Sequence, residues 1–159
     1  MTKLNDRGFS LIELLIVVAI IGIIAAIAIP NLLASRRAAN EGSALSSLRT
    51  IHSCEITYQS ASGGGQFGTL AELRTDSLVD EVLGSGQKSG YTFVATPSAP
   101  GASPVAFYTT AVPTITAGVG RTGTRRLGVT EDGVIHGDSV VLTPYADGDA
   151  VKAAPAVGN

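Results

Sequence analysis

Glu13 is the residue in this sequence whose surroundings most clearly require a chemical partner. It stands just inside an apolar run, because every residue from 14 to 29 is apolar or glycine. A carboxylate at the centre of a bilayer costs about 2.5–3.5 kcal/mol on insertion scales, and less near an end of the span. An acid in such a place is a functional hypothesis, and its natural partner is a cation. The plainer alternative is an acid that extends to the membrane surface.

The apolar run is long enough to cross a membrane. As a helix, residues 9–29 would be about 31 Å long, which matches the hydrocarbon core of a bilayer at ~30 Å. Lys3 and Arg7 precede the run, and basic residues favour the cytoplasmic side of a span. A secretory signal peptide would place a cleavage site of small residues after its apolar segment, but residues 30–35 match such a site poorly. We therefore expect a single membrane-spanning helix with the remaining chain outside the cytoplasm.

The residues around Glu13 closely resemble the prepilin signature of type IV pilins and type II secretion pseudopilins. The resemblance rests on residues 7–15, RGFSLIELL. In that family a membrane peptidase cuts after the glycine, on the cytoplasmic side of the apolar segment, and methylates the new N-terminal residue. The resemblance implies a cleaved basic leader that carries Lys3 and Arg7, a cut between Gly8 and Phe9, and N-methylation of Phe9.

The same resemblance assigns roles to residues of the mature helix. It implies that Glu13 pairs with the new amino group at Phe9 of a neighbouring subunit during filament assembly. Pairing within one chain stays an alternative, because one helical turn separates the two groups. Pro30 lies where the family has a helix-kinking proline, and Gly22 lies in the stretch that can loosen with it.

One helix of about 50 residues is expected to carry these groups. Small residues in its apolar half allow identical helices to pack closely, and a repeated head-to-tail contact then gives a helical polymer. Beyond Pro30 the pattern becomes amphipathic. The predicted apolar face comprises Leu45, Leu48, Ile51, Ile56 and Tyr58, and the predicted polar surface comprises Arg36, Arg37, Glu41 and Arg49. The glycine run at 63–65 ends the helix.

The predicted fold class is α+β, with the long helix packed against a small antiparallel sheet of three or four strands, as in the pilin fold. Four parts are expected: a leader (1–8), a transmembrane or filament-core helix (9–30), an amphipathic helix (31–59) and a globular head (60–159). Short helical turns are expected at 69–73 and 78–83. Alternating residues predict strands at 90–96, 107–112, 127–130 and 134–136, with a hairpin turn at 131–133.

The head offers little sign of chemistry, so no enzyme, catalytic residue or cofactor is predicted. It has no phosphate-binding glycine loop, zinc-ligand spacing or Ser-His-Asp order. A net charge of −2 without a basic stripe argues against a direct nucleic-acid site. Asp138, Asp147 and Asp149 are weak calcium candidates, and a solvated acidic turn is the favoured interpretation. His52 and the single cysteine, Cys54, are interpreted as ordinary packing residues.

These observations predict a structural subunit of a type IV pilus, a surface filament that serves motility, adhesion or DNA uptake in the family. The alternative is a type II secretion pseudopilin that forms a periplasmic pseudopilus, and a membrane-tethered receptor or enzyme domain is less favoured. The implied partners are other pilin subunits in a homopolymer, the prepilin peptidase, the inner-membrane assembly platform and membrane lipid. The implied location is the bacterial inner membrane before assembly and the extracellular pilus afterwards.

Overall fold

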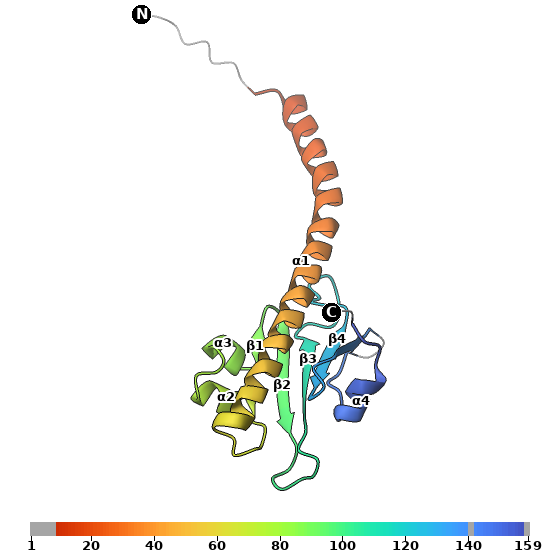
Figure 1. Cartoon of the computed structure of the whole chain (residues 1–159). Coiled ribbons are helices and arrows are strands. Elements are labelled where there is room, and N and C mark those ends of the chain that lie inside the picture. Colours follow the sequence, from red (N-terminus) through yellow and green to blue (C-terminus); the bar gives the residue numbers. More distant parts are fainter. Residues whose placement is uncertain (1–8, 140–141, 158–159) are drawn as a thin grey trace, which may run out of the picture. The chain divides into compact units, whose positions relative to one another are not determined.

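The computed structural model describes residues 9–139 and 142–157. The chain divides into two units, Met1–Ser35 and Arg36–Asn159, and each is described by itself. Helix α1 (Leu11–Ala61) runs from the first unit into the second (Figure 1). The other elements belong to the second unit. They are the short helices α2 (Leu70–Thr75) and α3 (Glu81–Gly84), five strands and the C-terminal helix α4 (Gly148–Ala153).

The described part of the first unit is a stretch of helix α1. The helix begins after Ser10, whose backbone C=O accepts the N–H of Leu14 at 3.3 Å. Pro30 lies inside α1, and the helix continues on both sides of it. Because proline has no backbone N–H, one intrahelical hydrogen bond is missing there, but a kink at Pro30 stays a prediction. The expectation of one long helix is confirmed, since α1 has 51 residues.

The sheet of the second unit has five antiparallel strands in chain order. They are β1 (Gln87–Lys88), β2 (Tyr91–Pro97), β3 (Phe107–Pro113), β4 (Arg126–Thr130) and β5 (Ile135–Asp138). The α+β class is confirmed, with five strands instead of three or four. The strand that sequence did not predict is β1, which turns into β2 through Ser89 and Gly90, both with positive φ. Two residues are too few to show the alternation that identifies a strand.

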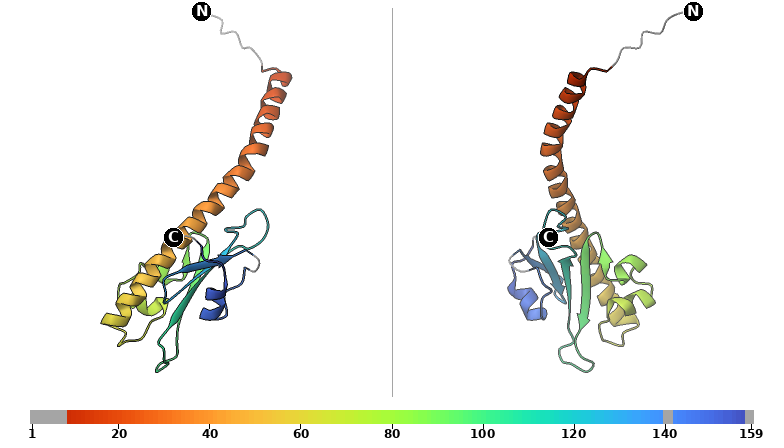
Figure 2. Two further views of the ribbon diagram at one scale, coloured as in Figure 1. Left: turned by 45° about the vertical axis from the view of Figure 1, so that its right-hand side comes forward. Right: turned by 180° about the vertical axis from the view of Figure 1, so that it is seen from behind.

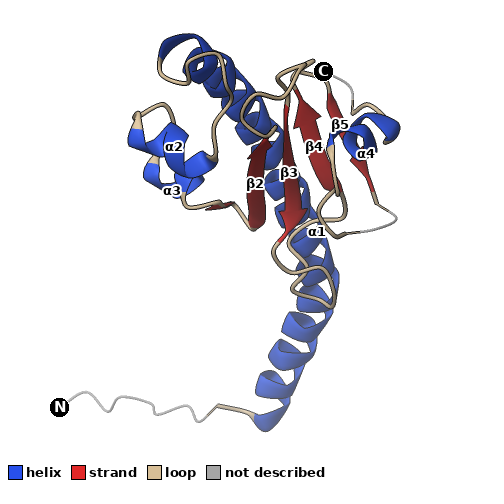
Figure 3. Cartoon of the chain, turned by 90° about the horizontal axis from the view of Figure 1, so that it is seen from below, coloured by secondary structure: helices blue, strands red, loops and turns tan. Residues whose placement is uncertain are grey.

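Different helices pack on the two faces of the sheet. Tyr91, Phe93 and Ala95 alternate along β2 and belong to the core shared with α1. On the opposite face, Val151 of α4 is buried. It lies so close to Gly128 that a Cβ added at Gly128 would be 3.0 Å from the methyl carbons of Val151. The sheet therefore lies between α1 and α4 within the second unit (Figure 2 and Figure 3).

Helix α4 was not predicted, because its acidic start was interpreted as a solvated turn. Asp147 precedes the helix in an extended conformation, and its side chain accepts the N–H of Ala150 at 2.8 Å. Aspartate is a favoured residue at this capping position. The acidic residues here begin a helix that packs on the sheet.

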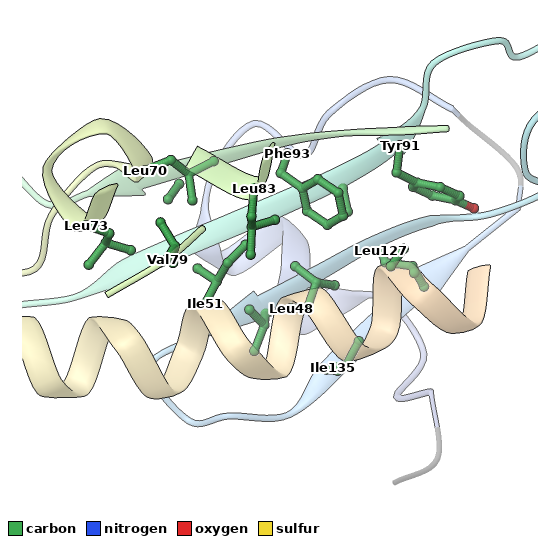
Figure 4. Packing of buried hydrophobic residues seen from close by; sticks show 14 residues of the cluster. Leu48, Ile51, Leu70, Leu73, Val79, Leu83, Tyr91, Phe93, Leu127 and Ile135 are labelled. Carbon is green, nitrogen blue, oxygen red and sulfur yellow. The ribbon is translucent and has the colours of Figure 1, made fainter. Parts of the chain in front are cut away.

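The hydrophobic core forms where α1 meets the sheet. Ala44, Leu48 and Ile51 are buried and repeat every three or four residues along one face of the helix. Figure 4 shows this face packed against side chains from the sheet and from the segment that connects α1 to it: Leu70, Leu73, Val79, Leu83, Tyr91, Phe93, Leu127 and Ile135. The predicted apolar face is confirmed for Leu48 and Ile51. It is wrong for Ile56, which is 43% exposed because five residues after Ile51 correspond to about 140° around the helix.

The two short helices begin at residues that satisfy their free N–H groups. At α2, the side chain of Thr69 accepts the N–H of Glu72, and Glu72 accepts the N–H of Thr69, which together form a capping box. At α3, Asp80 accepts the N–H of Leu83 at 2.6 Å. The first predicted turn is thus confirmed. The second is shorter than expected, because the cap at Asp80 sets the helix start at Glu81.

The C-terminal segment closes the outer edge of the sheet. The N–H of Gly137 donates to the C=O of Pro155 at 2.9 Å, and the N–H of Val157 donates to the C=O of Ile135 at 2.8 Å. His136 and Ala156 form an antiparallel bridge between these bonds. The backbone of β5 is therefore paired on both sides over this stretch.

Leu48→Ala is expected to lower the free energy of unfolding of the head by about 2–5 kcal/mol. The reason is that Leu48 is fully buried between α1 and the sheet. Ile56→Ala is the matched control on the exposed side of the same helix, with an expected loss of about 1 kcal/mol or less. Urea denaturation of the full chain in detergent micelles measures both changes. Equal losses for the two variants would contradict this description of the core.

Candidate functional site

The predicted cleavage junction lies where the described chain begins. Phe9 and Ser10 precede α1, and Phe9 is 76% exposed. Gly8 and the basic leader residues Lys3 and Arg7 lie outside the described residues, so their roles stay predictions. Phe9 is accessible and outside the helix, as a residue next to a cleaved bond needs to be.

Glu13 lies in the first turn of α1 and caps its N-terminus. Its Oε2 accepts the backbone N–H of Ser10 at 3.0 Å, one of the groups that a helix start leaves without an intrahelical partner. A negative charge is also favourable at this end of the helix dipole. An ionised carboxylate can accept about four hydrogen bonds, so Glu13 keeps capacity for a second partner. This acid is one turn from Phe9, the residue that a cut after Gly8 would make N-terminal.

Beyond Glu13, α1 presents apolar side chains on all sides. The large apolar residues between 14 and 29 are all exposed: Leu14, Leu15, Ile16, Val17, Val18, Ile20, Ile21, Ile23, Ile24, Ile27 and Ile29. A helix that is apolar all round belongs in a protein core or a membrane. By length and composition, α1 is the one helix in the described part of the chain that could cross a membrane. Lipid or other protein must therefore cover this surface.

Gly22 lies in open space on this helix. A Cβ at this position would meet no atom within 4 Å, and its φ is not in the left-handed region. Contacts within the chain thus give no reason for glycine here. A steric reason for it would have to come from a neighbouring molecule, and its role in loosening the helix stays a prediction.

The three calcium candidates have separate roles in the head. Asp138 on β5 pairs with Arg126 at 2.9 Å and accepts the hydroxyl of Tyr145 at 3.2 Å. Asp147 caps α4, and Asp149 lies in the first turn of that helix. Across residues 9–139 and 142–157, no three His, Cys, Asp or Glu side chains are placed to hold a metal ion together. The geometry therefore does not favour a shared metal site at these acids.

The histidine and the cysteine of α1 make contacts with other parts of the head. The Nε2 of His52 lies 3.3 Å from the backbone oxygen of Glu131. The Sγ of Cys54 donates to the C=O of Leu78 at 3.0 Å, and this side chain also packs against the core. Both residues join α1 to distant segments of the chain.

Glu41 is an anchoring residue that sequence analysis missed. It was predicted to lie on the polar surface, but it is buried. Its carboxylate accepts the backbone N–H of Thr124 at 2.7 Å and pairs with Nε of Arg125 at 3.2 Å. Burial raises the pKa of Glu41, but the hydrogen bonds from Thr124 and the charge of Arg125 together hold this pKa below its usual value of 4.5. The contact ties α1 to the loop before β4.

Known proteins match the chain over its N-terminal segment. Residues 3–29 match the family model of the prokaryotic N-terminal methylation motif. The chain carries the methylation motif of prokaryotic prepilins. One curated protein that matches is the type IV wide pilus major component PilA4 of Thermus thermophilus, with 68% identity over 37 residues, 23% of this chain and 28% of that protein. Another is the type IV major pilin protein PilA of Myxococcus xanthus, with 46% identity over 54 residues, 34% of this chain and 24% of that protein.

Over this segment the chain is homologous to type IV major pilins, which confirms the resemblance found in the sequence. The matched stretch amounts to about a quarter of the length of those curated relatives. No solved structure matches the chain. The prepilin motif thus accounts for the start of α1, and the α+β head is consistent with a pilin fold.

Glu41→Gln is expected to lower the free energy of unfolding by about 1.5–3 kcal/mol at neutral pH, the range for hydrogen bonds to charged groups. Because folding lowers the pKa of Glu41, its charge stabilises the head above the unfolded pKa, and this stabilisation is lost as the pH falls through the folded pKa. Urea denaturation of both proteins between about pH 7 and about pH 3 should show the difference shrinking with acid.

Glu81→Gln is the matched control for this experiment. Its carboxylate is largely exposed and lies 3.8 Å from Arg74, and exposed pairs of this kind contribute little. A stability difference between Glu41→Gln and the natural chain that stays constant with pH would contradict the charged anchor.

Proposed function

We propose that this chain is the precursor of a type IV pilus subunit, which polymerises through its N-terminal helix into a surface filament. The observation that carries the proposal is the combination of the prepilin motif with an exposed apolar helix that holds one acid in its first turn. The relatives named as major pilus components support the same role.

Removal of residues 1–8 would create the partner that Glu13 needs. Cleavage after Gly8 frees the amino group of Phe9, which is cationic or partly so near neutral pH. Glu13 already satisfies the N–H of Ser10 within its own chain. The spare acceptor capacity of its carboxylate is then open to the Phe9 amino group of a neighbouring copy. In an apolar environment each of these charges needs the other.

Small residues on the apolar half of α1 favour a polymer of such pairs. They allow the backbones of identical helices to approach closely. Such close packing matters in a membrane, because no hydrophobic force drives helices together in lipid. The small positions are Ala19, Gly22, Ala25, Ala26 and Ala28. A contact between the start of one helix and a different part of the next is heterologous, so it repeats without closing and builds a helical filament.

In this proposal the chain occupies two environments in turn, the membrane and the assembled pilus. It first lies in the bacterial inner membrane as a single-pass protein, surrounded by lipid, with its head outside the cytoplasm. The prepilin peptidase then removes the leader at the cytoplasmic face, and the inner-membrane assembly platform adds the subunit to the homopolymer. The assembled pilus is extracellular, and motility, adhesion and DNA uptake are its candidate activities.

Mass spectrometry of the mature N-terminus tests the processing step. We expect the loss of residues 1–8 and an added methyl group on Phe9. Gly8→Ser should block the cut, so that the full-length precursor accumulates. Gly22→Ser is the matched control, because a side chain at Gly22 meets open space in the chain, and it should be processed normally. An intact N-terminus in the natural protein, or a cut after Ala34, would contradict the proposal.

Glu13→Gln separates the assembly role of Glu13 from its capping role. Glutamine keeps an oxygen that can accept the N–H of Ser10 but lacks the charge that would pair with Phe9. Leaving one buried charge unpaired costs about 3–5 kcal/mol, so we expect at least a roughly tenfold loss of filaments. Glu13→Ala removes both contacts and should give no more filaments than Glu13→Gln. Membrane insertion of both variants should be intact.

Electron microscopy of sheared cell-surface material, with immunolabelling of this chain, measures the filaments. Normal yield from Glu13→Gln would show that capping suffices and would contradict the charge pair. The same experiment separates a pilus from the type II secretion alternative, because a periplasmic pseudopilus gives no labelled surface filaments in the natural strain.

A further inference from the structure

Glu55 is a second acid of α1 whose environment is unusual. It is fully buried near the C-terminal end of the helix. Its Oε2 accepts the backbone N–H of Gly68 at 2.9 Å. Its Oε1 is also buried and has no hydrogen-bond partner among the residues that the structure describes. If Glu55 were ionised, one of its two charged oxygens would be buried without a hydrogen bond, which is costly in a protein interior.

The hydrogen bond to Gly68 holds a segment that folds back onto α1. Residues 62–78 connect the end of α1 to α3 and include α2; we call them the connecting segment. The ring of Tyr58 lies against this segment so closely that a Cβ at Gly63 or Gly68 would be 2.8 Å or 2.9 Å from its carbons. Glycine at 68 therefore allows its N–H to reach Glu55. The hydrogen bond from Cys54 to Leu78 holds the other end of the segment.

The groups around Glu55 favour its neutral form. Glu72 of α2 faces it, and the cap at Thr69 lowers the pKa of Glu72 and so keeps that neighbour charged.

In the described part of the head, the other titratable groups near Glu55 do not supply a positive partner. On α1 itself, Cys54 and Tyr58 are weak acids whose pKa values are raised by burial, and Asp76 adds negative charge beside Tyr58. Of the basic side chains, Arg74 of α2 pairs with Glu81, and the Nε2 of His52 lies 3.3 Å from the backbone oxygen of Glu131. Burial is the largest influence and raises the pKa of Glu55. The hydrogen bond from Gly68 opposes this shift and the charge of Glu72 adds to it, so that the pKa of Glu55 is about 7.

We propose that the neutral carboxyl group of Glu55 is a latch that holds the connecting segment on α1, and that loss of its proton releases this segment. In the closed state the acid is buried and keeps its proton. In the open state the acid is in water, where it ionises readily. Release therefore exposes the carboxyl group, the N–H of Gly68 and part of the core around Leu73. The latch belongs to the head and does not depend on filament formation.

The direction of the pH dependence follows from the two pKa values. The usual value is 4.5, and the closed state has a pKa of about 7. Between these values the closed state retains a proton that the open state has lost, so opening becomes more favourable as the pH rises. The opening equilibrium should increase by up to about tenfold for each pH unit in this window, and become independent of Glu55 above it. The latch is thus tight in acid and loose above neutral pH.

Hydrogen exchange with mass spectrometry, on the full chain in detergent micelles, tests the latch. After correction for the intrinsic exchange rate, the protection factors of residues 66–75 should fall by about 40-fold between about pH 5 and about pH 7. Glu55→Gln stays neutral and fills the same space, so its protection in this segment should be nearly independent of pH. Glu81→Gln is the matched control and should behave like the natural chain. Equal pH dependence in Glu55→Gln and the natural chain would overturn the proposal.

Infrared spectroscopy of the natural chain gives a test that needs no variant. With ¹³C-labelled glutamate, a protonated glutamic acid should be visible at about pH 6 and should disappear as the pH rises past about 7. If all glutamates ionise below about pH 5, Glu55 is charged in the folded head and the latch does not exist. The spectrum would decide the question even if Glu55→Gln failed to fold.

Discussion

The N-terminal half of α1 cannot remain in water. Its large side chains are exposed all round the helix, and burial of apolar surface contributes about 25 cal/mol per Å². A bilayer and a bundle of identical helices both satisfy this requirement, because lipid tails are as apolar as leucine. Hydrophobicity alone therefore cannot move the subunit from one to the other. In the proposed filament Glu13 would distinguish them, since lipid offers it no cation, while a bundle of processed chains would supply one amino group for every carboxylate.

Three acids of α1 show how tertiary neighbours decide what one residue type does. Glu13 lies at a helix N-terminus, where partial positive charge favours an anion. Glu41 faces Arg125 and the donors of Thr124, so it keeps its charge. Glu55 is fully buried beside an acidic neighbour, and these two influences outweigh its one N–H donor, so its neutral form is favoured. The contacts of Glu41 and Glu55 with the head consequently respond to pH in opposite directions: acid weakens the first, and a rise toward neutral pH weakens the second.

The elements that could be predicted from the sequence are those that depend on local pattern. The long helix, the short helical turn at 69–73 and the longer strands all follow from the spacing of residues that are near each other in the chain. Glu13 was found for the same reason, since an apolar sequence surrounds it. Glu41 was misplaced because its partner Thr124 lies 83 residues away, and no local pattern reveals that contact. The burial of Glu55 likewise depends on the connecting segment folding back. Strand β1 is too short for alternation to show, and the acidic start of α4 was interpreted as a solvated turn.

The edges of the sheet suggest why association is directed to the helix. Open strand edges invite pairing between identical chains, a hazard that grows when subunits are concentrated along a polymer. Here β1 pairs with the start of β2, and residues 155–157 pair with β5 through backbone hydrogen bonds. With one cysteine in the chain, no internal disulfide can hold that last segment, so these bonds must do so. β1 covers only the start of β2, so the sheet edges are covered in part. The large exposed apolar side chains gather on the N-terminal half of α1, and a repeated heterologous contact there would give the proposed helical filament instead of an extended sheet.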